Sequence, residues 1–382
     1  MLLYMNGGYV LSFQMSEEED FEPRAEPPPP PTAPARGELR SDGVLVPAEG
    51  DASTLRNKGA FGETTPGGQL RLSWIETCYL TEAGRLVVER SGKVVGFRDL
   101  VRLAHRGRGD FEVLYVVYRD LRQRGDVVEE GASPIDFRVH PRGGRPGKTA
   151  TRTWVSAVSE RAPFVLREIL DRVRKVQGVR KQLLLGVVDE ESDLTYYAAR
   201  EVELHGTVVA RGASAKADLL ADRALVPDEA EARALAESGF FGKFLGRRLQ
   251  LSLLETAYLL DGGHLEVRSA RNDRPVGLAA VIRRARQMQP DFDLRFRVYR
   301  DLRSCGVVVK TGFKYGTHFR AYEGDPEKIH ARYLVHSLPA DYRGGWPEVS
   351  RAVRLAHGVK KHLVLASCGE SIAYVHLERV RP

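Results

Sequence analysis

Three residues in the second half of the chain carry side chains that together could cleave RNA without a metal ion: Tyr322, His330 and Lys361. Such cleavage needs a base for the proton of a 2′-hydroxyl, an acid for the departing 5′-oxygen, and a cation beside the phosphate. Histidine suits the acid because its unperturbed pKa is about 6.5. Tyrosine suits the base only where positive charge favours the phenolate. Lys361, with Lys360 and Lys310, is the expected source of that charge.

Each of these residues also has an ordinary structural interpretation. A tyrosine at a strand end commonly packs against its neighbours, and a histidine after a charged turn such as EGDPEK (323–328) is commonly exposed. Paired lysines before an apolar strand commonly lay their stems on the protein and keep their ammonium groups in water. Residue types alone therefore leave catalysis and packing both open.

The chain carries the same elements twice. VYRDLR occurs at 117–122 and again at 298–303, and VRKVQGVRKQLLLGVV (173–188) aligns with VRLAHGVKKHLVLASC (353–368). A repeat of this length indicates a duplicated pair of domains rather than a solenoid.

Each half is expected to hold a small α/β subdomain followed by a mixed-sheet domain, so the predicted fold class is α/β (α+β) in tandem duplication. Apolar spacing predicts one helix of the small subdomain in both copies, at Leu72, Ile75 and Tyr79, and at Leu251, Leu254 and Tyr258. The expected segments are a disordered tail over 1–37, a first subdomain over 38–110, a non-catalytic domain over 111–200, a second subdomain over 201–289 and a catalytic domain over 290–382.

The mixed-sheet domains are expected to open with a helix that ends at Gly125 or Gly306, because glycine favours the left-handed conformation after a helix. A further helix is expected over 347–358, with strands before and after it.

Composition limits the protein class. Lys and Arg outnumber Asp and Glu by 58 to 51, a modest excess that permits a polyanionic partner. Three cysteines without a CxxC pair indicate neither a disulfide framework nor a zinc site and suit a reducing cytoplasm. No apolar run approaches the roughly 18 residues of a membrane span.

The first residues differ from the rest. The acidic and proline-rich stretch 16–37 is expected to be a solvated leader, with a polyproline docking segment as the alternative. Met15 is a possible alternative start.

Alignment of the two halves indicates that only the second carries all three candidate catalytic residues and that the first is vestigial. His140 stands opposite Tyr322, and roughly Thr151 stands opposite His330. Only the lysine position is kept in both halves, since Lys181 matches Lys361. The chemistry is therefore expected in the second half alone.

The run VYRDLRSCGVVVKTGFKYGTHFRAYEGDPEKIHARYLVHSL, followed by VSRAVRLAHGVKKHLVLA, closely resembles the catalytic domain of the archaeal tRNA-splicing endonucleases. The shared motifs are YxDLRxxG, VKTGxKYGxxFRxY, HxxYLV and VRxAHxVxKK, in that order. The resemblance covers roughly 38–382 when the first half is included. The length resembles the fused type, in which one polypeptide holds a degenerate and a catalytic unit and two chains form a homodimer.

The resemblance implies that Tyr322 is the general base, His330 the general acid and Lys361 the transition-state cation, with neither metal nor other cofactor. Tyr315 is the weaker candidate for the base because the family's tyrosine ends the FRxY motif. Nearby His318 and His357 are expected to be structural or to support the site.

The resemblance also implies an RNA clamp in which two arginines hold an unpaired bulge base by cation–π contact. One falls on Arg354 and the other on Arg379, with Arg381 as the alternative. A candidate assembly contact is an acidic loop of the first half, formed by Asp189, Glu190, Glu191 and Asp193.

The implied function is cleavage of precursor tRNA at the bulge-helix-bulge of exon–intron junctions, which leaves 2′,3′-cyclic phosphate and 5′-hydroxyl ends. The alternative from another class is a non-catalytic RNA-binding or assembly subunit. A DNA-directed nuclease would need metal-binding carboxylate clusters, which the sequence does not suggest.

Overall fold

The computed structural model describes residues 33–141, 143–209 and 212–381. Most of the expected tail, with Met15, lies outside these residues. Its last part does not, because β1 (Ala35–Arg40) pairs in parallel with β5 (Leu86–Arg90) and Ala35 is buried opposite Leu86. The expected start of the folded chain at residue 38 is therefore too late.

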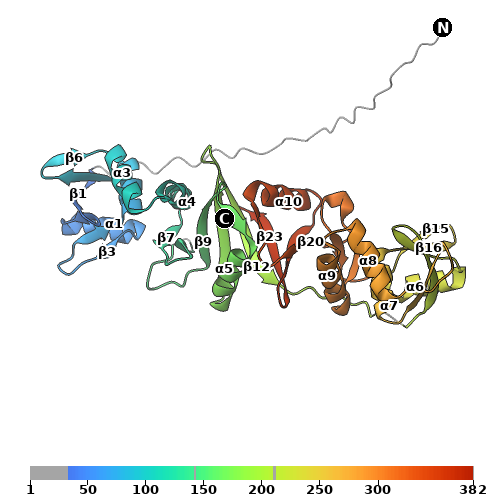
Figure 1. Cartoon of the computed structure of the whole chain (residues 1–382). Coiled ribbons are helices and arrows are strands. Elements are labelled where there is room, and N and C mark those ends of the chain that lie inside the picture. Colours follow the sequence, from blue (N-terminus) through green and yellow to red (C-terminus); the bar gives the residue numbers. More distant parts are fainter. Residues whose placement is uncertain (1–32, 142, 210–211, 382) are drawn as a thin grey trace, which may run out of the picture.

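Two small α/β subdomains lie at the two ends of an elongated molecule (Figure 1). The first has a sheet in the order β3-β4-β2-β1-β5-β6. Its remaining elements are β2 (Gly43–Val46), α1 (Glu49–Gly59), β3 (Glu63–Thr64), β4 (Leu70–Leu72), α2 (Trp74–Glu82), β6 (Lys93–Val95) and α3 (Phe97–Gly107).

The second subdomain repeats this plan with a sheet in the order β15-β16-β14-β13-β17. Its elements are β13 (Ala215–Leu219), β14 (Arg223–Val226), α6 (Glu229–Gly239), β15 (Lys243–Leu245), β16 (Arg248–Ser252), α7 (Leu253–Asp261), β17 (Leu265–Ser269) and α8 (Leu278–Met288).

Helices α2 and α7 begin later than the apolar spacing predicts. Leu72 and Leu251 lie in strands β4 and β16, so their assignment to the helices is wrong. The helices start after Ser73 and Ser252, which form capping boxes with the glutamates three residues on. Each serine hydroxyl accepts from the helix backbone while the glutamate accepts from the serine N–H, and this fixes the boundary.

A ten-stranded mixed sheet joins both halves in the order β18-β19-β20-β22-β23-β12-β11-β9-β8-β7. The mixed-sheet domain of the first half consists of α4 (Phe111–Gln123), β7 (Val127–Glu130), β8 (Phe137–His140), β9 (Thr153–Ser159), β10 (Pro163–Val165), α5 (Leu166–Gly178), β11 (Gln182–Val188) and β12 (Leu194–Val202). That of the second half consists of α9 (Phe292–Ser304), β18 (Val308–Thr311), η1 (Phe313–Tyr315), β19 (Phe319–Tyr322), β20 (Tyr333–Pro339), β21 (Arg343–Gly345), α10 (Trp346–Gly358), β22 (His362–Cys368) and β23 (Ile372–Val380).

The predicted fold class, with both domain types duplicated, is confirmed. The helix expected over 347–358 is α10, and Gly125 and Gly306 follow α4 and α9 with φ of 88° and 76°. The expected boundary at residue 200 falls inside β12, and Gly206 to Val208 bond to the second mixed-sheet domain rather than to the small subdomain.

Helices cover the large sheet on both faces. Helices α4 and α9 pack on one face at opposite ends of the sheet, in two separate cores. Helices α5 and α10 pack on the other face and share one core that continues across both halves.

The two halves meet at an antiparallel seam between β12 and β23, with Tyr197 opposite Arg379 and Ala199 opposite Leu377. Strands β10 and β21 form a second, two-stranded contact. Because the seam lies in the middle of the sheet, the halves form one continuous body.

Candidate active site

Three strand ends bring Tyr322, His330 and Lys361 to one edge of the sheet. Tyr322 is the last residue of β19, whereas His330 and Lys361 lie just before β20 and β22. Strand β19 is antiparallel to β20, and β20 is parallel to β22, so these ends coincide. Two backbone bonds close this edge: Arg332 N–H donates to Ala321 (3.2 Å) and His362 N–H to Arg332 (3.0 Å).

Tyr322 is 8% exposed and packs in a small cluster with Val308 and Ala331. The Arg320 guanidinium lies 5.9 Å from the centroid of its ring. Residues two apart on a strand share a face. Because Arg320 pairs with Leu334, whose side chain packs under α10, Tyr322 lies on the α10 face of the sheet.

His330 is exposed and follows a turn that Asp325 organises. The Asp325 side chain accepts from Glu327 N–H (2.9 Å), and its carbonyl accepts from Ile329 N–H (3.0 Å). Since Ala331 packs beside Tyr322, the turn holds His330 next to the tyrosine's cluster with its ring open to solvent.

Lys361 lies at a tight junction between α10 and β22. Lys360 has a φ of 54°, and Lys361 N–H donates to the Ala356 carbonyl (2.9 Å). The Lys361 ammonium donates to the Val359 carbonyl (3.3 Å) and lies 5.6 Å from the centroid of the Tyr315 ring. Tyr315 therefore holds this lysine by a cation–π contact that sequence reasoning did not predict.

Lys310 does not add to the charge at this edge, contrary to the expectation. Its ammonium donates to the Gly242 carbonyl (2.9 Å) and lies 3.7 Å from the Glu255 carboxylate, so it joins the second small subdomain to β18. Burial lowers the pKa of Lys310.

The strand register identifies the counterparts in the first half. His140 pairs with Val127 as Tyr322 pairs with Val308, which places His140 at the tyrosine position. Its Nε2 lies 2.7 Å from the Glu129 carboxylate and its Nδ1 lies 2.9 Å from the Thr149 carbonyl, so both ring nitrogens are bonded internally.

The counterpart of His330 is Ala150, not Thr151. Arg152 N–H donates to Val139 (3.1 Å) as Arg332 N–H donates to Ala321, and counting back two residues from each arginine gives Ala150 and His330. The segment from His140 to Ala150 is two residues longer than that from Tyr322 to His330, so sequence alone does not fix this position. Neither alanine nor threonine supplies a titratable group.

Of the two further histidines, His318 lies just before β19, at the end of that strand opposite Tyr322. His318 stacks on His336 with ring centroids 4.2 Å apart, and its Nδ1 accepts from Ser337 N–H (3.0 Å). Burial, His336 and Arg295 lower the pKa of His318 to about 3, so the ring is neutral and serves as an acceptor. His357 is exposed near the end of α10.

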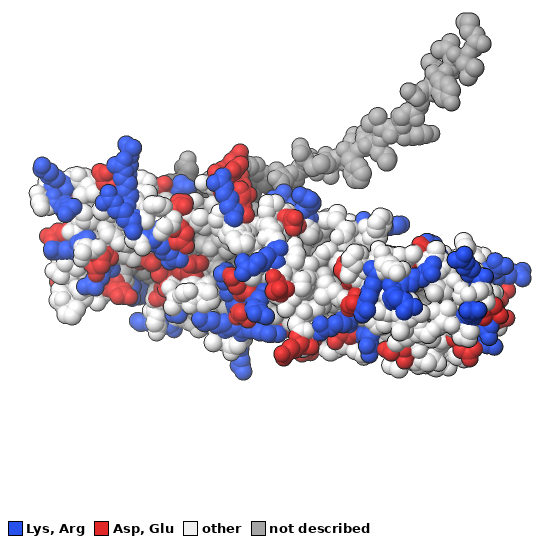
Figure 2. All heavy atoms as spheres, viewed as in Figure 1, with Lys and Arg blue, Asp and Glu red and all other residues white. Residues whose placement is uncertain are grey.

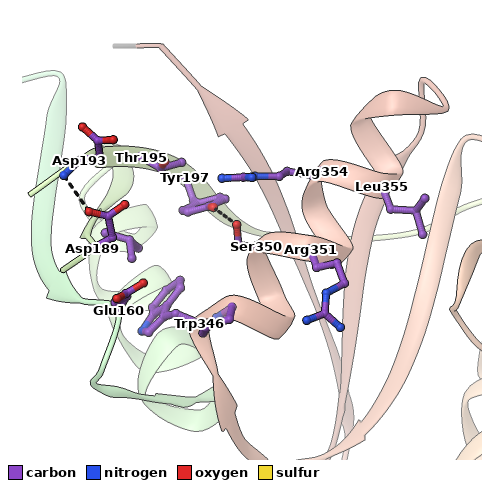
Figure 3. A pocket seen from close by; sticks show the side chains of 12 residues that line it. Glu160, Asp189, Asp193, Thr195, Tyr197, Trp346, Ser350, Arg351, Arg354 and Leu355 are labelled. Carbon is purple, nitrogen blue, oxygen red and sulfur yellow. Dashed lines mark hydrogen bonds between the residues drawn. The ribbon is translucent and has the colours of Figure 1, made fainter. Parts of the chain in front are cut away.

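Of the candidate RNA arginines, Arg354 lines a pocket of about 640 Å³ between β12 and α10 (Figure 3). Arg354 extends from α10 toward Tyr197, whose hydroxyl donates to Ser350 (2.9 Å). Arg379 is exposed and pairs with Tyr197 along the seam. Arg381 is exposed just beyond β23. The fold thus brings both expected clamp positions to the same tyrosine.

The acidic loop joins β11 to β12 at the edge of the sheet that holds Lys361. The Asp189 carboxylate accepts from the N–H groups of Glu191 (3.0 Å) and Asp193 (2.8 Å), and Glu190 is paired with Arg161 at 2.7 Å. Glu191 and Asp193 point their charges into solvent from a loop with internal order.

One group among the described residues has the composition of a metal site: His362, His376 and Glu378, with ligand atoms within 4.8 Å of one another. However, Arg200 Nε donates to His376 Nδ1 (3.0 Å), and His376 Nε2 lies 3.1 Å from His362 Nδ1. Burial and Arg200 lower the pKa of His376 to about 3. A hydrogen-bonded chain beside a guanidinium explains this group better than a cation would.

Comparison with known proteins decides the family. The model of the tRNA intron endonuclease catalytic C-terminal domain matches residues 111–196 and 292–374, and that of the N-terminal domain matches 35–101 and 215–282. The chain belongs to the tRNA intron endonuclease family. The resemblance found in the sequence is confirmed, and this family's two domains each occur twice.

Archaeal relatives match almost end to end. A tRNA-splicing endonuclease of Methanococcoides burtonii is 41% identical over 91% of this chain and 99% of its own length. Those of Methanosarcina mazei and Natronomonas pharaonis are 40% and 36% identical over 90% of this chain and 98% of their own lengths. Among the described residues, no helix is long and apolar enough to cross a membrane.

Proposed function

We propose that the protein excises introns from precursor tRNA by cutting the bulge-helix-bulge at each exon–intron junction. Family membership and the names of the relatives support intron cleavage. The observation that carries the site is the convergence of three strand ends, which gathers a tyrosine, a histidine and a lysine at one edge in the second half alone.

In the proposed reaction, Tyr322 accepts the proton of the 2′-hydroxyl, whose oxygen attacks the adjacent phosphorus. His330 protonates the departing 5′-oxygen, and Lys361 stabilises the negative charge of the phosphorane. The products carry a 2′,3′-cyclic phosphate and a 5′-hydroxyl. Because the solvent-open ring of His330 borders the buried Tyr322 cluster, the acid and the base can lie on opposite sides of a bound phosphate.

Arg354 and Arg379 are proposed to hold an unpaired bulge base, with Arg381 as the alternative to Arg379. Guanidinium planes suit this task because every base offers a π-face. The shared neighbour Tyr197 supports the pairing of these two positions.

Two chains are proposed to form a homodimer, because one chain holds one complete candidate active site and an intron has two junctions. The acidic loop over 189–193 is the proposed assembly contact, since it is ordered by Asp189 and presents exposed carboxylates. The three free cysteines suit a reducing cytoplasm.

The deciding experiment is cleavage of an intron-containing precursor tRNA in EDTA by the parent protein and by His330→Ala. We expect metal-independent cutting to cyclic phosphate ends that the substitution abolishes. A second substrate with 2′-deoxyribose at the scission site should bind and remain uncut, because the attacking hydroxyl is missing.

The competing function is a non-catalytic assembly subunit. It would be supported if well-folded parent protein bound the precursor without cutting it, and the search would then turn to a catalytic partner chain. A requirement for a divalent cation, restored after EDTA by added metal, would contradict the proposed chemistry.

A further inference from the structure

An aromatic side chain projects from the loop between β18 and β19. Phe313, the first residue of η1, is 87% exposed, more than any other large apolar side chain in the part of the chain that the structure describes. Lys314 follows it and is also exposed. An exposed phenylalanine side chain gains no hydrophobic stabilisation from the fold. Its exposure therefore indicates a contact with a binding partner.

The loop is rigid. Gly312 N–H donates to His318 (3.0 Å), Tyr315 N–H to Gly312 (2.8 Å) and Gly316 N–H to Phe313 (3.1 Å). Gly316 has a φ of 63°, and a Cβ on Gly312 would lie only 2.4 Å from the Thr317 hydroxyl. The turn therefore holds Phe313 outward before anything binds, which lowers the entropic cost of a contact.

The loop is also tied to the candidate active site. The ring of Tyr315, two residues after Phe313, lies under the Lys361 ammonium at 5.6 Å. Tyr315 packs against the core beneath α10, so the loop lies over the same face of the sheet as Tyr322. Phe313 and Lys314 thus belong to the loop whose Tyr315 contacts the proposed transition-state cation.

The first half provides an internal comparison. Its loop is closed by the same bond, from Gly131 N–H to Asp136 (2.7 Å), but contains Ala132, Ser133, Pro134 and Ile135. It has neither an aromatic ring nor a cation. Of the two matching loops, only the one in the half with the complete set of candidate catalytic residues carries an aromatic and basic pair.

We propose that Phe313 stacks on an unpaired base of the bound RNA, while Lys314 faces a neighbouring phosphate. This inference rests on the proposed function and adds a base-binding residue to it. Stacking on aromatic side chains and charge pairing with the backbone are how proteins grip single-stranded nucleic acid. Because every base can stack, the contact favours an unpaired nucleotide over a paired one without selecting its sequence.

The test measures binding of a bulged RNA that carries 2-aminopurine at one bulge position at a time. The protein carries His330→Ala, so that the RNA stays intact. We expect Phe313→Ala to weaken binding about tenfold, or about 1.4 kcal/mol, and to relieve the quenching of 2-aminopurine at one position. Phe313→Trp should keep both, and Val94→Ala should change neither, because Val94 is an exposed side chain (69%) of strand β6 in the first small subdomain.

Equal affinity and equal quenching for Phe313→Ala would overturn the inference while the proposed function stands. So would a shift of Phe313→Ala from dimer to monomer in sedimentation, which would assign Phe313 to a protein contact. Absence of RNA binding by the protein with Phe313 intact would instead reject the proposed function.

Discussion

At the scale of single residues, two lysines occupy the same backbone position in the two halves. Lys181 N–H donates to Val176 (3.0 Å) after Arg180 at a φ of 56°, which repeats the junction before Lys361. The turn is therefore part of the scaffold in both halves. Lys361 differs from Lys181 in that the Tyr315 ring lies beneath its ammonium group. The matching loop of the first half has no aromatic side chain that could contact Lys181 in this way.

This pair allows a matched test of the proposed cation. We expect Lys361→Ala to slow single-turnover cleavage of precursor tRNA about 100-fold or more, since it removes fixed charge from the transition state. Lys181→Ala should cleave at the parent rate. Equal losses in the two variants would show that the position serves folding alone.

At this scale the sequence predicted the positions of the candidate catalytic residues but not all of their contacts. Motif order placed Tyr322, His330 and Lys361 on three strand ends that the fold brings to one edge. It did not predict the Tyr315 contact, which depends on how a short loop folds back over the sheet. It also took roughly Thr151 for the counterpart of His330, because unequal loops leave the sequence alignment uncertain there and only the strand register fixes it.

At the scale of elements, side chains bridge the second and third strands of each mixed-sheet domain where backbone pairing ends. His318 accepts from Ser337 N–H in the second half, and the Asp136 carboxylate accepts from Ala157 N–H (2.8 Å) in the first. The same structural task is thus done by a neutral histidine in one copy and a carboxylate in the other.

The histidine version should make stability depend on pH. With its pKa lowered to about 3 by burial, His318 stays neutral in the folded chain while the unfolded chain takes up a proton below about pH 6.5. The contribution of His318 to the free energy of unfolding is complete above that pH. It decreases as the pH falls, by at most about 1.4 kcal/mol per pH unit. His318→Asn keeps the acceptor without the titration. Urea unfolding between about pH 7 and pH 5 should therefore be less pH-dependent in the variant, and parallel curves would contradict this account.

Element boundaries were predictable where a single residue type decides them. The glycines after α4 and α9 were found because positive φ favours glycine. The starts of α2 and α7 were misplaced because Leu72 and Leu251 fit the helical spacing equally well from the preceding strands. The serine caps fix the first residue of each of these helices, and the spacing of apolar residues does not reveal such caps.

At the scale of the whole molecule, one core unites the halves. Trp346 of α10 is buried and packs edge-on to Phe164 of the first half, with centroids 5.2 Å apart, and stacks near Tyr197 at 6.2 Å. The sequence did not predict this junction, because pairing between distant strands leaves no local pattern. Charge adds no comparable organisation: on the face in Figure 2, basic and acidic side chains are interspersed along the molecule.

Removal of this ring should weaken both halves together. Trp346→Ala is expected to cost about 3–5 kcal/mol of unfolding free energy and to speed amide exchange in β11 as well as β22. Trp346→Phe should cost less, since the buried indole N–H has no hydrogen-bond partner in the described part of the chain. Faster exchange confined to the second half would show that the halves are energetically separate.

The β12–β23 seam also limits which residues of the first half can change without affecting the second. His140 and Ala150, which stand at the positions of Tyr322 and His330, lie away from the seam, so substitutions there leave the pairing of the two halves in place. Substitutions along the seam, where Ala199 opposes Leu377 and Tyr197 donates to Ser350 of α10, would disturb the sheet that carries the candidate active site. A duplicated domain that shares a sheet with its copy is thus constrained most at the strands that join them.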